Sequence, residues 1–347
     1  MGEPWYLLSR LFLRSVVPVN GFWTRRSLLI GGIGMLAAPS LLSCAHGQRE
    51  SRNPRVGFII GAGYQGLLDA FHGELSRLGY TPGQNIDLVE RLTLSDNAAR
   101  NAAEIAIMDL DLVVASALPF ALLIRAANPN MPMVIGTGAG LVCNGFGESM
   151  DRPGRNVTGM EELPPGLTGK RLELLLAAAP YVRRAGLLST TPGTCGHEIQ
   201  LADAQSAAAR LMVSVKPYRA TNPEQLRQAL KAILQDGQQG FVNFQGGLSL
   251  GNRQSIVDFA AEHRLPAIYQ AELFAESGGL MTWAPDQNEQ MRIAARRMDE
   301  ILRGAKPGDL PILYPERYLL TLNRSAASRI GLAFPQRMLA SANRVID

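Results

Sequence analysis

The sequence is poor in the residue types that most often carry chemistry. Its 347 residues include three cysteines and four histidines, and 6% are aromatic. The histidines are scattered, no C-x-x-C occurs, and the carboxylates do not cluster at ligand spacing, so we expect no metal site. G-x-S-x-G is also missing, and Ser116 is followed by Ala-Leu-Pro, which lacks an elbow glycine. The residues therefore give no support to metal-dependent or hydrolytic catalysis.

A strong excess of one charge is missing as well. The formal net charge is +4, but four arginines and a single acid fall in the first 44 residues. These are Arg10, Arg14, Arg25, Arg26 and Glu3. The remainder carries 30 basic and 29 acidic residues. Such a balance lacks the electrostatic footprint that binding to a phosphate backbone requires, so we expect no nucleic-acid partner.

The apolar stretch near the start is interrupted by Gly31, Gly34 and Pro39 and is shorter than the roughly twenty residues that a membrane span needs. It follows the pair Arg25-Arg26, as in a twin-arginine export signal, and ends at Leu-Leu-Ser-Cys, which resembles a lipobox. We therefore interpret residues 1–44 as an export leader with Cys44 as the lipidation site, which would give a periplasmic protein with a possible lipid anchor. Cleavage near residue 45, a retained anchor and the true start site stay open.

What the chain has in abundance is alternation of short apolar runs with helical spacing. In the first half, runs at 55–60, 86–94, 110–115 and 131–135 alternate with helical patterns. The second half repeats the rhythm, with strands expected at 185–188, near 213, and at 240–244, 266–269, 278–283 and 318–322. This pattern predicts the α/β class, with two Rossmann-like lobes whose parallel sheets are flanked by helices.

The run R-P-G-R-N-V-T-G at 152–159 separates the two series. Pro153 fixes its own φ, and Gly154 and Gly159 allow backbone conformations that other residues avoid, so we interpret the run as a crossing between lobes. Lobe 1 is expected to comprise 54–160 plus about 284–312, and lobe 2 161–283 plus about 313–347. A cleft between two lobes is a common site for small molecules. We expect a monomer.

Two smaller expectations follow from this division. Cys143 and Cys195 fall on opposite sides of the crossing, and since a bond between them would restrain lobe movement, we expect two free thiols. Lys170 and Arg171 follow a glycine as in a phosphate loop, but the first glycine and the Ser/Thr of that loop are missing. We expect both to lie on the solvated start of a helix.

Open α/β sheets bind ligands at the carboxyl ends of their strands, and small or polar residues gather at these positions. The candidates in lobe 1 are Gly63, Tyr64, Ser116, Ala117, Thr137 and Gly138, and those in lobe 2 are Thr190, Asn243, Gln245, Tyr269 and Glu272. Loop amides at helix N-termini suit a carboxylate, hydroxyls fix orientation, and Tyr64 or Tyr269 would stack on an apolar or aromatic body.

A dinucleotide site is the main alternative. Gly61-Ala62-Gly63-Tyr64-Gln65-Gly66 matches G-x-G-x-x-G between a strand and a helix, and Glu90 is placed to serve as the ribose acid. An exported NAD(P)-dependent oxidoreductase would fit this pattern. No pair of residues suited to hydride transfer emerges, however, and a single match of this kind is weak. We therefore expect no cofactor and no enzymatic activity.

Several long blocks resemble the solute-binding proteins of ABC transporters, of the type that includes tryptophan- and tyrosine-binding lipoproteins. The blocks span nearly all of the chain after the leader. They are F-H-G-E-L-S-R-L-G-Y-T-P-G-Q-N-I (71–86), R-P-G-R-N-V-T-G, G-K-R-L-E-L-L with Pro180, R-L-P-A-I-Y (264–269), G-G-L-M-T-W-A-P-D (278–286) and I-L-R-G-A-K-P-G-D-L-P (301–311).

The resemblance implies a type I periplasmic-binding-protein-like fold with three hinge crossings, which we place near Gly159, Gly279 and Leu313. It also implies delivery of a small organic ligand, such as an amino acid, to a permease driven by a separate ATPase. Where the family commonly has Gly-Asp-Pro, this chain has Gly140-Leu141 in the Asp-Pro positions, and Trp283 stands where Tyr is frequent. If the missing acid holds the ligand, its loss argues against an amino acid. A ligand sensor for a membrane receptor is a further alternative.

Overall fold

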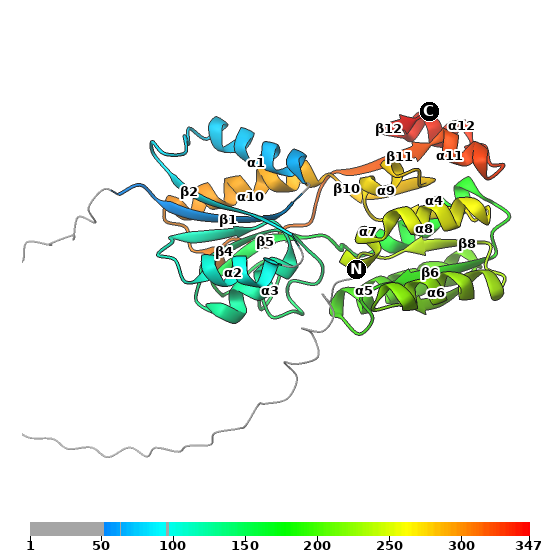
Figure 1. Ribbon diagram of the computed structural model, residues 1–347, viewed down its shortest axis with the longest axis horizontal. Helices are drawn as coiled ribbons and strands as arrows, with labels where there is room; N and C mark the ends of the chain where they lie inside the picture. Colours follow the sequence, from blue (N-terminus) through cyan, green and yellow to red (C-terminus); the bar gives the residue numbers. More distant parts are fainter. Residues whose placement is uncertain (1–51, 63, 95–96) are drawn as a thin grey trace, which may run out of the picture.

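The computed structural model describes residues 52–62, 64–94 and 97–347, and these form two lobes that lie end to end (Figure 1). Each lobe is built on one sheet, with five strands in lobe 1 and seven in lobe 2. Neighbouring strands pair in parallel, except for one antiparallel pair in lobe 2. The fold class expected from the sequence, two mostly parallel sheets flanked by helices, is confirmed.

Lobe 1 is a three-layer sandwich. Its strands are β1 (Arg55–Gly61), β2 (Asp87–Thr93), β3 (Leu112–Ala115), β4 (Met133–Gly138) and β5 (Val157–Glu161), in the order β2-β1-β3-β4-β5. Helices α1 (Gln65–Arg77) and α10 (Gln287–Leu302) cover one face, and α2 (Ala98–Ala106) and α3 (Leu118–Ala127) cover the other. Because β3 and β4 are buried on both faces, their sequences are continuous apolar runs.

Lobe 2 repeats this architecture around a larger sheet. Its strands are β6 (Arg184–Ser189), β7 (Ser214–Arg219), β8 (Gly240–Asn243), β9 (Ala267–Tyr269), β10 (Met281–Pro285), β11 (Tyr318–Asn323) and β12 (Arg344–Ile346), in the order β12-β11-β10-β9-β8-β6-β7. Its helices are α4 (Leu167–Ala178), α5 (Cys195–Leu211), α6 (Pro223–Gln235), α7 (Gly247–Gly251), α8 (Arg253–Glu262), α9 (Glu272–Glu276), α11 (Arg324–Arg329) and α12 (Gln336–Ser341).

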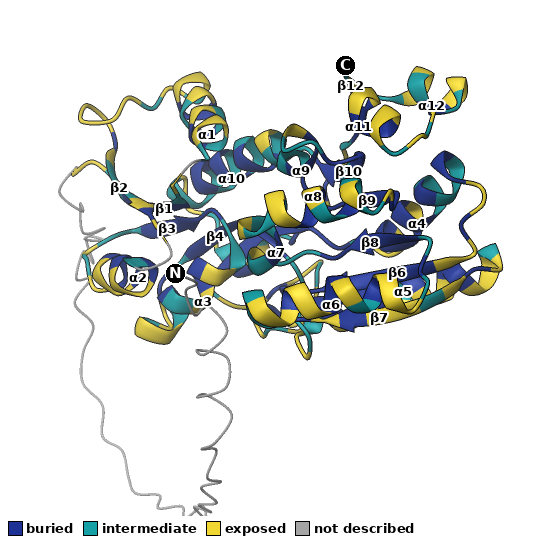
Figure 2. Cartoon of the chain, turned by 45° about the vertical axis from the view of Figure 1, so that its right-hand side comes forward, coloured by how far each residue is buried: buried dark blue, intermediate teal, exposed yellow. Residues whose placement is uncertain are grey.

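The cores lie between each sheet and its helices. In lobe 2, α4 and α5 pack on one face of the sheet, while α6, α8 and α9 pack on the other. Figure 2 shows the strands mostly buried and the outer faces of the helices exposed. The carboxyl ends of the parallel strands in both lobes are thereby left free of helix packing, which is where open α/β sheets bind ligands.

Three segments connect the lobes. The first, 162–166, runs from β5 to α4; the second is Asp286, between β10 and α10; the third, 310–317, leads to β11. The end of β5, just before the first segment, is joined to the third segment by hydrogen bonds, including Glu161 N to Leu313 O at 2.8 Å. The second and third are joined by Asp286 N to Arg317 O at 3.0 Å.

Of the three expected hinge residues, one lies in a connecting segment and two lie near one. Leu313 is in the third segment, but Gly159 lies inside β5, where it pairs with Ile135 of β4. Gly279 precedes β10 and approaches the backbone of Phe274 in lobe 2. The run 152–159 is therefore mainly the approach to an edge strand of lobe 1, and the connection follows it.

Two other expectations need correction. Arg171 is fully buried, and its Nε donates to the carbonyl oxygen of Trp283 at 2.9 Å. Lys170 beside it is exposed, as expected. The strand β12 was not predicted, because its sequence contains no apolar run; it is held by pairing with β11. The burial of Arg171 involves a residue 112 positions away. The strand β12 depends on a strand about twenty positions earlier. A local sequence pattern reveals neither.

The glycine in β5 offers a test of this packing. A Cβ on Gly159, whose φ is +154°, would collide with the backbone carbonyl oxygen of Ile135. We expect Gly159→Ala to lower the free energy of unfolding by roughly 2–4 kcal/mol, because neither backbone can move without breaking the sheet. Urea unfolding followed by circular dichroism measures the effect.

Gly73→Ala is the matched control. Gly73 is an exposed residue inside α1, and a Cβ there meets nothing within 4 Å. This variant should gain about 0.5–1 kcal/mol from helix propensity. Equal effects of the two substitutions would show that Gly159 is not required by the close approach of the strands.

Candidate functional site

The loops at the strand ends of lobe 1 face lobe 2. Tyr64 precedes α1, Ala117 precedes α3, and Ser116 and Thr137 are buried at the ends of β3 and β4. Thr137 Oγ1 donates to the carbonyl oxygen of Ser116 at 3.0 Å, which ties the two strand ends together. Gly138 ends β4 in contact with Leu141. Gly63 lies outside the described residues.

The facing loops of lobe 2 supply three buried or half-buried side chains. Thr190 follows β6, Asn243 ends β8, and Gln245 comes two residues later. Asn243 Nδ2 donates to Gln270 Oε1 at 2.7 Å, and the backbone N–H of Gln245 donates to Gln200 Oε1 at 2.9 Å. The first bond fixes the orientation of the Asn243 amide, and the second fixes the backbone at Gln245.

Glu162, in the first connecting segment, joins the two sets of loops. It accepts a hydrogen bond at Oε2 from Gln245 Nε2 and is 5% exposed. Burial raises the pKa of Tyr64, while Arg253 of α8 lowers it and Glu162 raises it. The phenol of lobe 1 therefore lies within electrostatic reach of Glu162 and of lobe 2.

Four buried oxygens at this boundary have no hydrogen-bond partner among the residues that the structure describes. They are Glu162 Oε1, Thr190 Oγ1, Asn243 Oδ1 and Gln245 Oε1, which we call the boundary oxygens. The carboxylate and the two amide oxygens only accept hydrogen bonds, and the hydroxyl of Thr190 can accept as well. Buried polar atoms are nearly always paired in folded proteins, so this arrangement is complementary to a ligand that donates several hydrogen bonds.

The charge state of Glu162 follows from its burial. Desolvation raises the pKa of Glu162 to about 7, with a further increase from Glu161, while the nearby side chain of Gln287 and the charge of Arg171 lower it. Burial likewise lowers the pKa of Arg171 to about 10, so this guanidinium is charged at neutral pH. A cation placed beside Glu162 would stabilise its ionised form.

Glu161 performs a different task from its neighbour. Its carboxylate accepts from the backbone N–H groups of Gly140 at 2.9 Å and Leu141 at 2.7 Å, and from that of Leu163 at 3.1 Å. Burial raises the pKa of Glu161, whereas these hydrogen bonds lower it. The loop in which the Asp-Pro of the resembling family is missing is thus ordered by an acid from the adjacent strand.

Two of the expected ligand residues are engaged elsewhere. Tyr269 is fully buried in lobe 2, where its ring stacks on Phe274 at 4.6 Å between centroids. Glu272 pairs with Arg344 of β12 at 2.7 Å. Both were predicted because an aromatic or acidic residue stands at a strand end. Packing within lobe 2 accounts for the position of Tyr269, and ion pairing accounts for that of Glu272.

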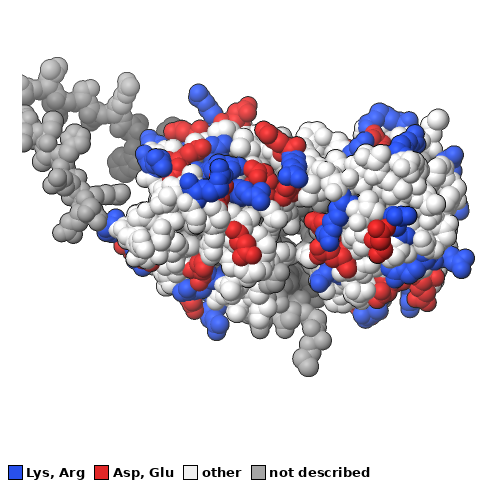
Figure 3. Space-filling model, turned by 90° about the horizontal axis from the view of Figure 1, so that it is seen from above, with Lys and Arg blue, Asp and Glu red and all other residues white. Residues whose placement is uncertain are grey.

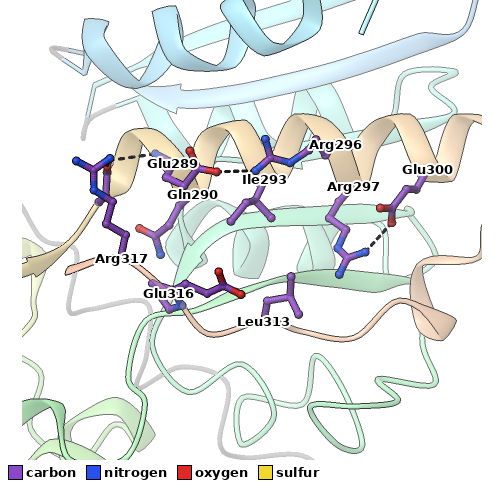
Figure 4. Close-up of a pocket in the computed structure, with 11 residues that line it drawn as sticks. Glu289, Gln290, Ile293, Arg296, Arg297, Glu300, Leu313, Glu316 and Arg317 are labelled. Carbon is purple, nitrogen blue, oxygen red and sulfur yellow. Dashed lines mark hydrogen bonds and ion pairs between the residues drawn. The ribbon is translucent and has the colours of Figure 1, made fainter. Parts of the chain in front are cut away.

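A groove of about 490 Å³ lies apart from this boundary, between α10 and the third connecting segment (Figure 4). Its charged residues are largely paired, as in Arg297–Glu300 and Arg296–Glu289, both at 2.6 Å. Of the expected site residues, only Leu313 lines it. Because two connecting segments form its walls, its shape depends on the angle between the lobes.

The expectation of two free thiols is wrong. Cys143, in the loop between β4 and β5, and Cys195, the first residue of α5, form a disulfide with their Cα atoms 6.3 Å apart. The bond joins lobe 1 to lobe 2. Sequence could not reveal this, because 52 positions separate the two residues and only the fold brings them together.

Other features bear on the functional class. Basic and acidic side chains are interspersed over the face shown in Figure 3. Within the described residues, no group of three or more His, Cys, Asp or Glu is placed to hold a metal ion. Searching those same residues for a helix of sufficient length and apolarity to traverse a bilayer finds none.

Comparison with known proteins decides the family. A family model described as "ABC transporter substrate binding protein" matches residues 60–346. The chain belongs to this family. A tyrosine-binding protein of Clostridioides difficile (strain R20291) is 21% identical over 256 residues, which cover 73% of each protein.

Solved structures share the fold of this substrate-binding protein. One is an ABC domain from Streptococcus pneumonia in complex with L-Trp, with a TM-score of 0.76 and 20% identity over 85% of this chain and all of the other. Another is the ligand-free, open structure of a substrate binding protein with adhesive properties from Clostridium difficile, with a TM-score of 0.66 and 19% identity over 84% and 99% of the two chains. The type I periplasmic-binding-protein-like fold is thereby established.

Glu161 and Glu162 of the substrate-binding protein were not among the residues expected from sequence. The signal was present: two adjacent acids lie between apolar Met160 and Leu163, directly after V-T-G. Glu161 ends β5 and Glu162 begins the first connecting segment; the first carboxylate serves the loop of lobe 1 and the second reaches lobe 2. Acids flanked by apolar residues at a strand end indicate buried carboxylates with specific partners.

The pKa of Glu162 predicts how stability depends on pH. Since the pKa is about 7 in the folded protein and 4.5 as the reference value, the folded state binds more protons than the unfolded state between these values. Glu162 should therefore lower the free energy of unfolding progressively as pH rises from 4.5 to 7, by up to ~3 kcal/mol.

Glu162→Gln should remove this contribution. The measurement is the free energy of unfolding of wild type minus that of the variant at several pH values, a difference in which Glu161 and His197 largely cancel. We expect the difference to fall as pH rises through this window. A difference that is flat, or that rises with pH, would show that Glu162 is ionised in the folded protein throughout.

Proposed function

We propose that this substrate-binding protein captures a small organic solute bearing an amino group, with an amino acid as the leading class, by closing its lobes over it. The solute is then released unchanged to a permease that is driven by a separate ATPase. The observation that carries the proposal is the set of four boundary oxygens. They are contributed by the first connecting segment and by lobe 2, and Glu162 among them lies within electrostatic reach of Tyr64 of lobe 1.

The chemistry of the boundary oxygens favours a cationic amine. An ammonium group offers three donors and no acceptor, and it would convert Glu162 from a partly protonated acid to an ion-paired carboxylate. Thr190, Asn243 and Gln245 would accept the remaining hydrogen bonds. Tyr64 is placed to lie against the body of the solute, as a phenol combines an apolar face with a polar tip.

The relatives support the same class. One is named for tyrosine and another was solved with L-Trp. The missing Asp-Pro no longer argues against an amino acid, because Glu161 orders the Gly140-Leu141 loop and Glu162 supplies a carboxylate. Closure follows from population shift: contacts made by both lobes exist only in the closed form, so a bound solute favours that form.

The dinucleotide alternative receives less support. Glu90, the expected ribose acid, lies inside β2 opposite Phe58 and contacts His72 Nε2 through its Oε1 at 2.6 Å. An acid that recognises a ribose must lie free at the end of its strand. Glu90 is instead held against α1 in the middle of β2, an edge strand of the sheet.

We further propose that the protein acts outside the cytoplasm, with Cys44 as its lipid anchor. Cys44 and the rest of the leader lie outside the described residues, and the support is the sequence of the leader itself. Membership in the substrate-binding family agrees with an extracytoplasmic location.

The ligand class is tested by thermal unfolding with L-tryptophan, L-tyrosine and a panel of other amino acids, each beside its N-acetyl derivative. We expect one or more free amino acids to raise the Tm by about 5 °C or more at saturation, by mass action on the folded state. The N-acetyl forms should not, because acetylation removes the charge and two donors. A panel without any response would contradict the amino-acid class.

Two glutamates make matched variants for this screen. Glu162→Gln should abolish or strongly reduce the response, since it removes the charge beside the amine. Glu272→Gln should leave it intact, since Glu272 pairs with Arg344 within lobe 2. Loss of the response in Glu272→Gln and its persistence in Glu162→Gln would reverse our assignment of the site.

The anchor is tested by fractionating cells that express the full chain. We expect wild type in the membrane fraction with a lipid-sized increase in mass, because acylation adds roughly 0.8 kcal/mol of membrane affinity for each buried CH₂. Cys44→Ala should appear in the soluble extracytoplasmic fraction or retain its leader. A wild-type protein whose mature chain begins after residue 44 without added mass would contradict lipidation.

A further inference from the structure

We propose that the Cys143–Cys195 disulfide is a redox latch, which fixes the lobes at the angle seen in this structure when oxidised and lets them part when it is reduced. Solute exchange would then depend on the thiol state of the protein. The inference rests on the function proposed above, because a latch matters only if exchange requires the lobes to separate. It adds a regulatory step that the fold alone does not require.

The lobe 1 end of the bond is held firmly. Cys143 lies in a loop whose first two N–H groups, those of Gly140 and Leu141, donate to the buried carboxylate of Glu161. Asn144 Nδ2 donates to the carbonyl oxygen of Gly140 at 2.7 Å, and Arg125 donates to that of Asn144 at 2.9 Å. The loop therefore has little slack with which to follow a moving lobe 2.

The lobe 2 end is equally fixed. Cys195 is the first residue of the 17-residue helix α5, whose N-cap Thr194 accepts from the N–H of His197 at 3.2 Å. The side chain of His197 is fully buried and bonded to Ser189 Oγ at 2.7 Å, which attaches this end of the helix to β6. Any rotation of lobe 2 must therefore carry Cys195 with it.

Two glycines let the lobes approach at this point. A Cβ on Gly140, whose φ is +76°, would lie 2.8 Å from Cys143 Sγ and 3.3 Å from Cys195 Sγ. A Cβ on Gly196 would lie 3.1 Å from the side chain of Ala139 in lobe 1. Side chains at either position would push the two sulfurs apart, so the local sequence is suited to this contact.

The disulfide is a fourth connection between the lobes. The third chain segment is joined by backbone hydrogen bonds to 159–161 at the end of β5 and to Asp286, and neither cysteine belongs to any of these segments. Two bodies joined by such segments can still rotate relative to one another, but a further short covalent link between them restricts that rotation. With the link between Cα atoms limited to the length of one disulfide, opening is blocked.

The bond is accessible to a dithiol reductant. Cys143 is exposed and Cys195 half-buried. A thiolate of the reductant attacks Cys143 Sγ, and the S–S electron pair leaves on Cys195, where the N-terminus of α5 stabilises the negative charge. The second thiol of the reductant then displaces Cys143. The reductant becomes a disulfide, and two electrons and two protons yield two cysteine thiols.

Hydrogen exchange of the solute-free full chain tests the latch without knowledge of the solute. The probe is the amide exchange rate of 187–191 and 241–247, which carry the boundary oxygens of lobe 2, and of 133–141, which faces them. We expect tris(2-carboxyethyl)phosphine to accelerate exchange in these segments by roughly tenfold or more. Segments 226–233 and 256–260, on the far face of the lobe 2 sheet, serve as internal controls.

Variants separate the latch from general stabilisation. Cys143→Ser and Cys195→Ser should each exchange like reduced wild type, with or without reductant. Unchanged exchange in the facing segments on reduction would overturn the proposal, as would an equal acceleration in the control segments, which indicates a merely structural bond. Two free thiols in protein isolated from the oxidising compartment would overturn it too.

Failure of the latch is distinguishable from failure of the proposed function. If exchange responds to reduction but no compound of the amino-acid panel raises the Tm in either redox state, the latch stands and the ligand class fails. If L-tryptophan or another panel compound binds and dissociates at the same rate in both redox states, the ligand class stands and the latch fails. An oxidised protein that responds only after reduction supports both.

Discussion

The adjacent carboxylates of Glu161 and Glu162 are the interaction on which the rest of the structure depends. They lie where the five-stranded sheet ends and the chain crosses to lobe 2. The first carboxylate contacts a loop of lobe 1, and the second contacts Gln245 of lobe 2. Glu161 accepts hydrogen bonds from the N–H groups of Gly140 and Leu141 in one loop of lobe 1, and from that of Leu163 in the first connecting segment. Glu162 is bonded to Gln245 across the boundary. One dipeptide thus positions both the loop and the candidate site.

The same dipeptide links the site to the disulfide. The loop that Glu161 orders carries Cys143, and the loop that contacts Glu162 through Gln245 directly follows Asn243. A movement that separates the lobes must therefore disturb the Gln245 contact and extend the Cys143–Cys195 link together. Solute affinity, closure and thiol state are in this way coupled through a small set of contacts at the first connecting segment.

Sequence reasoning predicted the architecture because most strands are buried on both faces. β3 and β4 are continuous apolar runs, and the helices between them have clear spacing. β5 escaped notice, since V-T-G-M-E includes a glycine and an acid that serve the bulged edge of the sheet and not its core. The family resemblance was confirmed, because it rested on several long blocks in order and not on one motif.

The site was less accessible to sequence reasoning. Strand-end positions such as Thr190, Asn243 and Gln245 could be named as candidates, because topology alone brings strand ends together, and their role in binding stays a prediction. Tyr269 looks the same in sequence, yet its neighbours Phe241 and Phe274 draw it into the core of lobe 2. The disulfide was not predicted, because the distance between Cys143 and Cys195 is set by the fold and cannot be read from the sequence.

The position of α10 has a consequence for how the chain matures. This helix follows β10 in sequence but packs on α1, where Arg296 pairs with Glu74 at 2.9 Å across 222 positions. One face of lobe 1 therefore stays uncovered until synthesis has passed residue 302, when most of lobe 2 has already emerged from the ribosome. Contacts this distant close late, and because β11 and β12 of lobe 2 follow α10 in sequence, neither lobe is complete until nearly the whole chain has been made. Secretion by a route that accepts finished proteins would let this assembly take place in the cytoplasm, and the bond between the sulfurs would then form only after export.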